Sequence, residues 1–134
     1  MPGIEAASSY ADMRRQEAVS PKRLYALDAV WTPESPVADV AELTGLAIAA
    51  VRSGGGHVLE TSHVVFPNGA LTVVLILAES HLSIHTWPEE SLIAIDLFSC
   101  GSIDGERVLD ELTRSLRLAS IRVSRLERGL APQA

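Results

Sequence analysis

LTVVLILA, residues 71–78, is the longest predominantly apolar run in this chain of 134 residues. It has the length of a buried strand and is far shorter than the roughly 20 residues that cross a bilayer. ESHLSIHTWPE, residues 79–89, follows directly and gathers carboxylates, serines, histidines and a threonine beside that run. Polar groups next to a core strand must be satisfied or used. We therefore predict a central strand over 71–78 and a candidate functional segment over 79–89.

Periodic segments on both sides of this run predict the other elements. Segments rich in leucine, β-branched and aromatic residues, bounded by turn residues, are typical of strands: 23–31, 57–66, 92–98 and 120–126. Two segments with apolar side chains at helical spacing indicate helices: 37–52 and 104–116. Asp104 is the expected N-cap of the second helix. The order strand, helix, three or four strands, helix, strand predicts an α+β fold, a two-layer sandwich of one mostly antiparallel β-sheet with two helices on one face.

The domain organisation is simple. Residues 1–22 are mixed, polar and without a steady period, so we expect a flexible N-terminal extension. Residues 23–134 are enough for a single domain and too few for two ordinary ones.

Composition limits the classes of partner. The formal net charge of −6 disfavours a nucleic-acid binder, which normally presents a basic face. Cys100 is the single cysteine, so no internal disulfide forms and a reducing compartment is indicated. The first twenty residues lack the apolar core of a signal peptide, and no segment has the length of a membrane span. We expect a cytoplasmic protein with no nucleic-acid partner and no membrane association.

The lysine content constrains the chemistry. Lys22 is the only lysine and lies in the polar N-terminal stretch. Many enzymes that act on amines or α-amino acids hold pyridoxal phosphate on a core lysine. If this chain performs carbanion chemistry on an amino acid, its carbonyl group must come from another source.

The segment 79–89 is open to several interpretations. One interpretation is a polar loop at the sheet edge. A metal site is disfavoured, because on a strand His81 and His85 would lie about 13 Å apart, too far to share one ion. A serine hydrolase is disfavoured because no Gly-x-Ser-x-Gly elbow is present.

Two blocks at a defined spacing carry a resemblance to a known family. ESHLSIHTWPE, residues 79–89, followed by AIDLFSCG, residues 94–101, resembles the signature of the small prokaryotic S-adenosylmethionine decarboxylases. The likeness extends more weakly from Leu24 to Gly129 and includes the late Glu127-Arg128-Gly129.

The resemblance implies that the chain makes its own cofactor. Ser80 attacks the carbonyl of Glu79, and β-elimination then cuts the chain into a β chain, 1–79, and an α chain, 80–134. The former Ser80 becomes a pyruvoyl group, which forms a Schiff base with the substrate amine and accepts electrons as CO₂ leaves. The product of S-adenosylmethionine would be the aminopropyl donor of spermidine synthesis. The absence of a core lysine agrees with such a cofactor.

The resemblance also assigns roles by position. His85 matches the histidine that assists the elimination, and Cys100 matches the general acid of decarboxylation. Thr72 stands where a serine supports processing. Glu89 matches the carboxylate that binds the ribose hydroxyls, and Phe66 the aromatic that stacks on adenine. From the residues alone, Cys100 could equally be a small buried side chain of the core. Phe66 could equally be a large one.

One geometric consequence follows for the site. Ser80 and His85 are five residues apart, and in a regular strand an odd offset sends side chains to opposite faces. If both serve one site, the chain must bend or bulge, and we predict a strained break between Ser80 and Leu82.

Departures from the family pattern keep other functions open. Glu90 is an extra acid where the family has an aromatic residue, and Asp28 and Glu60 are expected on neighbouring strands, so these acids suit the cation of L-ornithine or L-arginine. An uncleaved paralogue that regulates a partner is a third possibility.

The resemblance implies a homodimer of processed αβ units with sites between them. A sheet with helices on one face also needs cover on the other face.

Overall fold

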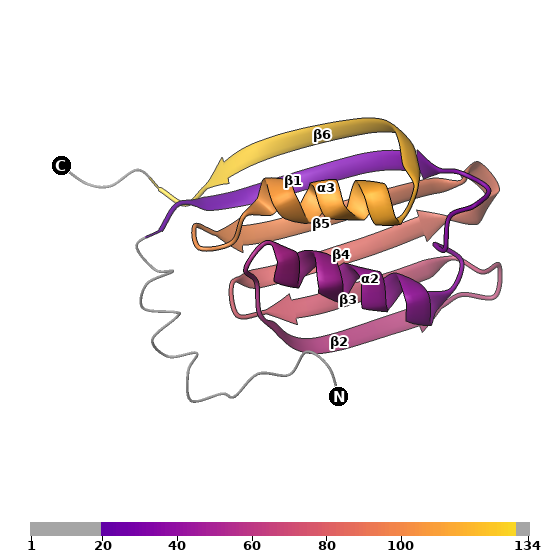
Figure 1. The fold of residues 1–134 in the computed structure, drawn as a ribbon, viewed down its shortest axis with the longest axis horizontal. Coiled ribbons are helices and arrows are strands. Elements are labelled where there is room, and N and C mark those ends of the chain that lie inside the picture. Colours follow the sequence, from indigo (N-terminus) through magenta and orange to yellow (C-terminus); the bar gives the residue numbers. More distant parts are fainter. Residues whose placement is uncertain (1–19, 131–134) are drawn as a thin grey trace.

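The computed structural model describes residues 20–130 as one six-stranded antiparallel sheet and two helices (Figure 1). In chain order the elements are β1 (Lys22–Trp31), α2 (Val40–Ser53), β2 (Val58–Val65), β3 (Leu71–Leu77), β4 (Ser80–Trp87), a 3-10 turn (Pro88–Glu90), β5 (Leu92–Cys100), α3 (Gly105–Ser115) and β6 (Leu118–Arg128). The strands lie side by side in the order β2-β3-β4-β5-β1-β6. The predicted α+β sandwich is therefore confirmed.

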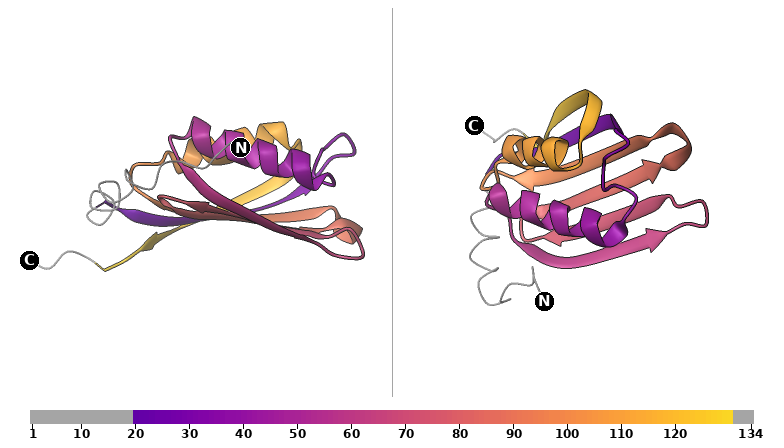
Figure 2. Two further views of the ribbon diagram at one scale, coloured as in Figure 1. Left: turned by 90° about the horizontal axis from the view of Figure 1, so that it is seen from below. Right: turned by 45° about the vertical axis from the view of Figure 1, so that its right-hand side comes forward.

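Both helices cover the same face of the sheet (Figure 2). Alternate residues of β1, β3, β4 and β5 point into the layer between sheet and helices, and α2 and α3 supply the other half of the core. The largest fully buried side chains of this layer include Leu27, Leu43, Leu75, Leu82, Ile84, Ile93, Ile95, Leu97 and Leu112. Burial of these side chains is the main term that stabilises the sandwich.

Side-chain caps set where the helices begin. Asp39 accepts hydrogen bonds from the backbone N–H groups of Ala41 and Glu42, so α2 starts at Val40 and not at residue 37 as expected. Asp104 accepts from the N–H of Arg107 and is the N-cap of α3, as predicted. Of the extension expected over 1–22, residues 1–19 lie outside the described part of the chain, and Lys22 is the first residue of β1.

The polar segment 79–89 contributes a strand of its own, so four strands separate the two helices along the chain. In β4 the residues Leu82, Ile84 and Thr86 are buried under the helices. His81, Ser83 and His85 alternate with them and point to the opposite face. The alternation explains the composition of the segment, because one strand serves the core with one side and a polar surface with the other.

The second face of the sheet carries no helix among residues 20–130 (Figure 2). We call it the open face. Apolar and polar residues mix on it, and Ile76 and Trp87 are 44% and 39% exposed. Within residues 20–130, neither α2 nor α3 combines the length and the apolar character of a membrane-spanning helix.

Candidate active site

The bond between Glu79 and Ser80 lies in a tight turn at one end of the sheet. Ala78 and Glu79 form the whole loop between β3 and β4, and Leu77 pairs with Ser80 across it. A two-residue hairpin of the favoured kind needs positive φ inside its loop. Neither Ala78 nor Glu79 has positive φ, and Ser80 has φ of 140° instead. The turn therefore places its unusual backbone conformation on the serine itself.

This conformation is strained for a residue with a side chain. A positive φ outside glycine costs on the order of 1–3 kcal/mol when the surroundings enforce it. The distortion predicted between Ser80 and Leu82 is thus present, and it is confined to Ser80. From His81 to Trp87 the strand stays in regular register with β5, so there is no bulge there.

The Glu79 side chain is anchored inside the protein. Its residue is fully buried, and its carboxylate accepts hydrogen bonds from the backbone N–H of His57 at 2.9 Å and from His57 Nδ1 at 2.8 Å. His57 lies just before β2. Sequence reasoning missed this contact, because nothing in a pattern of neighbours connects residues 22 positions apart.

Cys100 lies at the same end of the sheet. It is buried, ends β5 and pairs with Lys22 of β1. His81 of β4 pairs with Phe98 of β5, and one further step of this antiparallel register puts Ser80 level with Ser99. Cys100 is therefore close to the level of the Glu79–Ser80 bond, as the expected site requires.

Basic and aromatic side chains flank this end on the neighbouring strands. The Arg128 guanidinium lies 5.4 Å from the ring centre of Phe98, and His81 contacts the same ring edge-on. Arg128 also pairs with Lys22 across β6 and β1. The motif Glu127-Arg128-Gly129 thus lies at the end of the sheet that carries Ser80.

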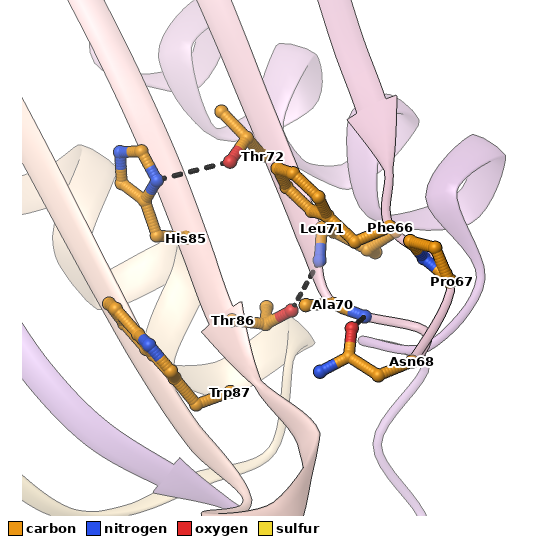
Figure 3. A pocket seen from close by; sticks show the side chains of 9 residues that line it. All are labelled: Phe66, Pro67, Asn68, Ala70, Leu71, Thr72, His85, Thr86 and Trp87. Atoms are coloured by element: carbon orange, nitrogen blue, oxygen red, sulfur yellow. Dashed lines mark hydrogen bonds between the residues drawn. The ribbon is translucent and has the colours of Figure 1, made fainter.

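His85 and Thr72 form a second polar pair at the other end. They are opposite each other on β4 and β3, and His85 Nδ1 lies 3.2 Å from Thr72 Oγ1 (Figure 3). Five residues of regular strand separate Ser80 from His85, which corresponds to about 16 Å. The strained turn does not bring them together, so a single chain does not unite Ser80 and His85 in one site.

A pocket of about 500 Å³ surrounds the His85–Thr72 pair. Phe66 and Trp87 add aromatic rings to its lining. Figure 3 shows that the two rings come from separate segments of the chain. The floor is stiffened by Thr86, whose Oγ1 accepts a hydrogen bond from the N–H of Leu71 at 2.8 Å. An apolar pocket with a few placed polar groups is the usual form of a small-molecule site.

Glu89 lies beside this pocket and touches it through Asn68. The Asn68 amide nitrogen is 3.4 Å from a Glu89 carboxylate oxygen, and both side chains are exposed. Glu90 is exposed in the same 3-10 turn and is absent from the pocket lining.

The acids proposed for a basic amino acid do not converge. β1, which holds Asp28, and β2, which holds Glu60, are separated by three strands, so the expectation that they are neighbours is wrong. Asp28 pairs with Arg122 at 3.1 Å, and Glu60 is exposed on the edge strand. The sequence did not reveal this separation, because the order of strands in a sheet is decided by tertiary packing.

Comparison with known proteins shows the family of the chain. The family model of S-adenosylmethionine decarboxylase matches residues 23–129. The S-adenosylmethionine decarboxylase proenzyme of Thermotoga maritima is 44% identical over 82 residues, which are 60% of this chain and 62% of that protein. The proenzyme of Pyrococcus furiosus is 30% identical over 107 residues, covering 79% of this chain and 77% of its own.

A solved structure extends the likeness to three dimensions. The adenosylmethionine decarboxylase of Aquifex aeolicus superposes with a TM-score of 0.72 and 27% sequence identity, over 86% of this chain and 96% of that one. Because the family match covers nearly the whole described chain, the protein belongs to the S-adenosylmethionine decarboxylase family, pyruvoyl-dependent lyases made as proenzymes that cut themselves at a serine.

Proposed function

We propose that the chain cleaves itself between Glu79 and Ser80 and then decarboxylates S-adenosylmethionine to the aminopropyl donor of spermidine synthesis. One observation carries the proposal. Ser80 has φ of 140° directly after a buried, hydrogen-bonded Glu79 in a two-residue turn. Strain on a nucleophile next to an immobilised carbonyl-bearing residue favours reaction of that bond.

The cleavage uses atoms of the chain itself and one water molecule. Ser80 Oγ bonds to the Glu79 carbonyl carbon, the C–N bond breaks, and the hydroxyl proton passes to the nitrogen. Loss of the Ser80 α-proton then breaks the Cβ–O bond and releases the Glu79 carboxylate. This elimination leaves a dehydroalanine enamine, which becomes an imine by moving a proton from nitrogen to Cβ. Water then hydrolyses the imine to a pyruvoyl group and ammonia. His85, supported by Thr72, is the proposed base of the elimination.

The residues at the Ser80 end suit a pyruvoyl group. Ser80 is partly exposed at the start of β4, so the new chain end has access to a substrate. Among residues 20–130 the single lysine, Lys22, lies on β1 and is no buried anchor for another carbonyl cofactor. When formed, the group takes up the electron pair of the bond that breaks as CO₂ leaves. Cys100 holds a proton at Sγ and returns it to the substrate α-carbon.

The pocket at the other end suits the nucleoside. Phe66 and Trp87 offer aromatic faces to adenine, and Glu89, held by Asn68, accepts hydrogen bonds from the ribose hydroxyls. The reduced Cys100 supports the cytoplasm as the place of action. Ornithine and arginine are not favoured, since within residues 20–130 Asp28, Glu60 and Glu90 do not gather around one site for their cation.

A homodimer would bring Ser80 of one copy next to His85 of the other copy. Ser80 and Cys100 lie about 16 Å along the strand from His85 and Thr72. If two copies pack open face to open face with their strands antiparallel, the Ser80 end of each copy meets the His85 end of the other. The same packing covers Ile76 and Trp87, which are otherwise exposed. A closed two-fold pair uses one self-complementary surface and creates two equivalent sites.

The proposal is tested on purified protein by intact mass and by CO₂ release. Cleavage gives two chains ending at Glu79 and starting at residue 80, the second lighter by one ammonia than a serine-started fragment. Carboxyl-labelled S-adenosylmethionine should release CO₂, while labelled ornithine and arginine should not. A single full-length mass would overturn the self-cleavage, and release from a basic amino acid alone would overturn the substrate.

A further inference from the structure

His57 is hydrogen-bonded to both residues of the turn that contains the Glu79–Ser80 bond. Its backbone N–H and its ring Nδ1 each donate to one oxygen of the Glu79 carboxylate, at 2.9 and 2.8 Å. Its carbonyl accepts a hydrogen bond from the N–H of Ala78 at 2.9 Å. Both residues of the two-residue loop are thus tied to one residue of another strand connection.

The buried carboxylate makes this contact specific. Among residues 20–130 Glu79 is the only charged residue that is buried, and its side chain is 1% exposed. A buried carboxylate is strongly destabilising unless it is paired and hydrogen-bonded, so the Glu79 side chain has one favourable position. The His57 side chain is 42% exposed, so its outer edge stays in contact with water while Nδ1 serves Glu79.

His57 is itself held by the core. It follows Gly56, where an added Cβ would lie 2.6 Å from Val51 Cγ1 and 2.7 Å from Ile103 Cδ1. The backbone before His57 is therefore pressed against α2 and against Ile103, just before α3. The contact to Glu79 starts from a packed segment and not from a free loop.

We propose that His57 is a positioning residue for the self-cleavage. It fixes the orientation of Glu79, so that the Glu79 carbonyl carbon faces Ser80 Oγ in the strained turn, and it touches none of the reacting atoms. The inference rests on the proposed function and concerns its first step, the acyl shift from nitrogen to oxygen. That step is an isomerisation that needs no co-reactant, so its rate depends on orientation.

The experiment follows cleavage of the full-length chain after rapid cell-free synthesis, by intact mass over time. His57→Leu removes the ring donor, and His57→Asn returns an amide nitrogen near the place of Nδ1. His63→Leu is the matched control, because His63 is an exposed histidine of β2. We expect His57→Leu to cleave about tenfold more slowly or worse, with His57→Asn and His63→Leu within about threefold of wild type.

A parallel sample with hydroxylamine identifies the step. Hydroxylamine cleaves an ester at Glu79, so it reports ester that has formed but has not been eliminated. We expect it to add little cleavage in His57→Leu, because the acyl shift is the step that is lost. Full cleavage of His57→Leu by hydroxylamine would assign the defect to elimination and overturn the inference.

A loss of folding is separated from a loss of positioning in an uncleavable background. His57→Leu and His57→Asn are compared by thermal unfolding with Ser80→Ala present in both. Cleavage is then measured at a temperature where both variants are folded. Slow cleavage of folded His57→Leu supports positioning, whereas a loss of cleavage only where that variant is unfolded overturns it. Wild type that stays whole refutes the proposed function and this inference together. Equal cleavage of wild type and His57→Leu refutes the inference alone.

Discussion

Ser80 carries both the nucleophile and the strained backbone of the turn. Glycine adopts positive φ without the penalty that a Cβ brings, whereas alanine keeps that penalty. Both Ser80→Gly and Ser80→Ala remove the hydroxyl and abolish cleavage. We predict that Ser80→Gly is more stable than Ser80→Ala by about 1 kcal/mol, since relief of strain exceeds the greater freedom of glycine in the unfolded chain. Urea unfolding of the two uncut proteins measures the difference, and a less stable glycine variant would argue against strain at Ser80.

Cys100 is predicted to matter for decarboxylation and not for cleavage. It is buried near the level of Ser80, and the proposed proton transfer uses its Sγ. Cys100→Ala should cleave at the wild-type rate and release CO₂ from S-adenosylmethionine roughly 10²- to 10⁴-fold more slowly. The two readouts are the chain masses and labelled CO₂ from one preparation. Unchanged CO₂ release would remove Cys100 from the mechanism and leave it a small core residue.

Among the elements, α3 packs on β1 with no room to spare. At Gly105, the first residue of α3, an added Cβ would lie 2.6 Å from Tyr25 Cζ on β1. Gly105→Ala should therefore destabilise the fold by about 1–3 kcal/mol. Gly45 in α2 is the control, because it is helical and a Cβ there meets nothing within 4 Å. Gly45→Ala should stabilise by about 0.5–1 kcal/mol, and the same sign for both variants in urea unfolding contradicts the packing argument.

An ion pair ties the start of α3 to β6. The hydrogen-bonded guanidinium of Arg125 holds the pKa of Glu106 below its usual value. A carboxyl with a lowered folded-state pKa stabilises the protein above its unfolded-state pKa, and that stability is lost as pH falls through the folded-state value. Glu106→Gln should thus be less stable than wild type at pH 7, with the gap closing in acid and in high salt. Asp110→Asn, exposed on the same helix, is the control for charge alone, and a gap that persists in acid contradicts the assignment.

At the scale of the whole molecule, the separation of Ser80 from His85 predicts complementation between two inactive chains. Ser80→Ala keeps His85, and His85→Ala keeps Ser80, so a mixed pair contains one complete site. Co-synthesis of the two variants should cleave up to about half of the chains that carry Ser80, because random pairing places half of them in mixed dimers. Intact mass identifies the cleaved chain. No cleavage in the mixture, although Ser80→Ala and wild type co-assemble, means that each site is built within one chain.

The sequence determined the layers of the sandwich and the chemistry available to it. Helical and alternating spacing express local geometry, so the α+β class, the Asp104 cap and the central strand over 71–78 were predictable from neighbouring residues. The blocks at residues 79–89 and 94–101 indicated the family through their resemblance to its signature, whereas the residue types alone left several interpretations open. The start of α2 was missed by three residues, since the Asp39 cap competes with the apolar period that begins at Val37.

Tertiary structure alone decided how the functional residues meet. The order of the strands separated Asp28 from Glu60, and the regular register of β4 set Ser80 and His85 at opposite ends. The contact of His57 with Glu79 joins residues 22 positions apart. The positive φ of Ser80 is imposed by the hairpin, in which Ser80 pairs with Leu77 across the two-residue loop. Each of these depends on packing between segments distant in the chain, and such packing leaves no signal in the pattern of adjacent residues.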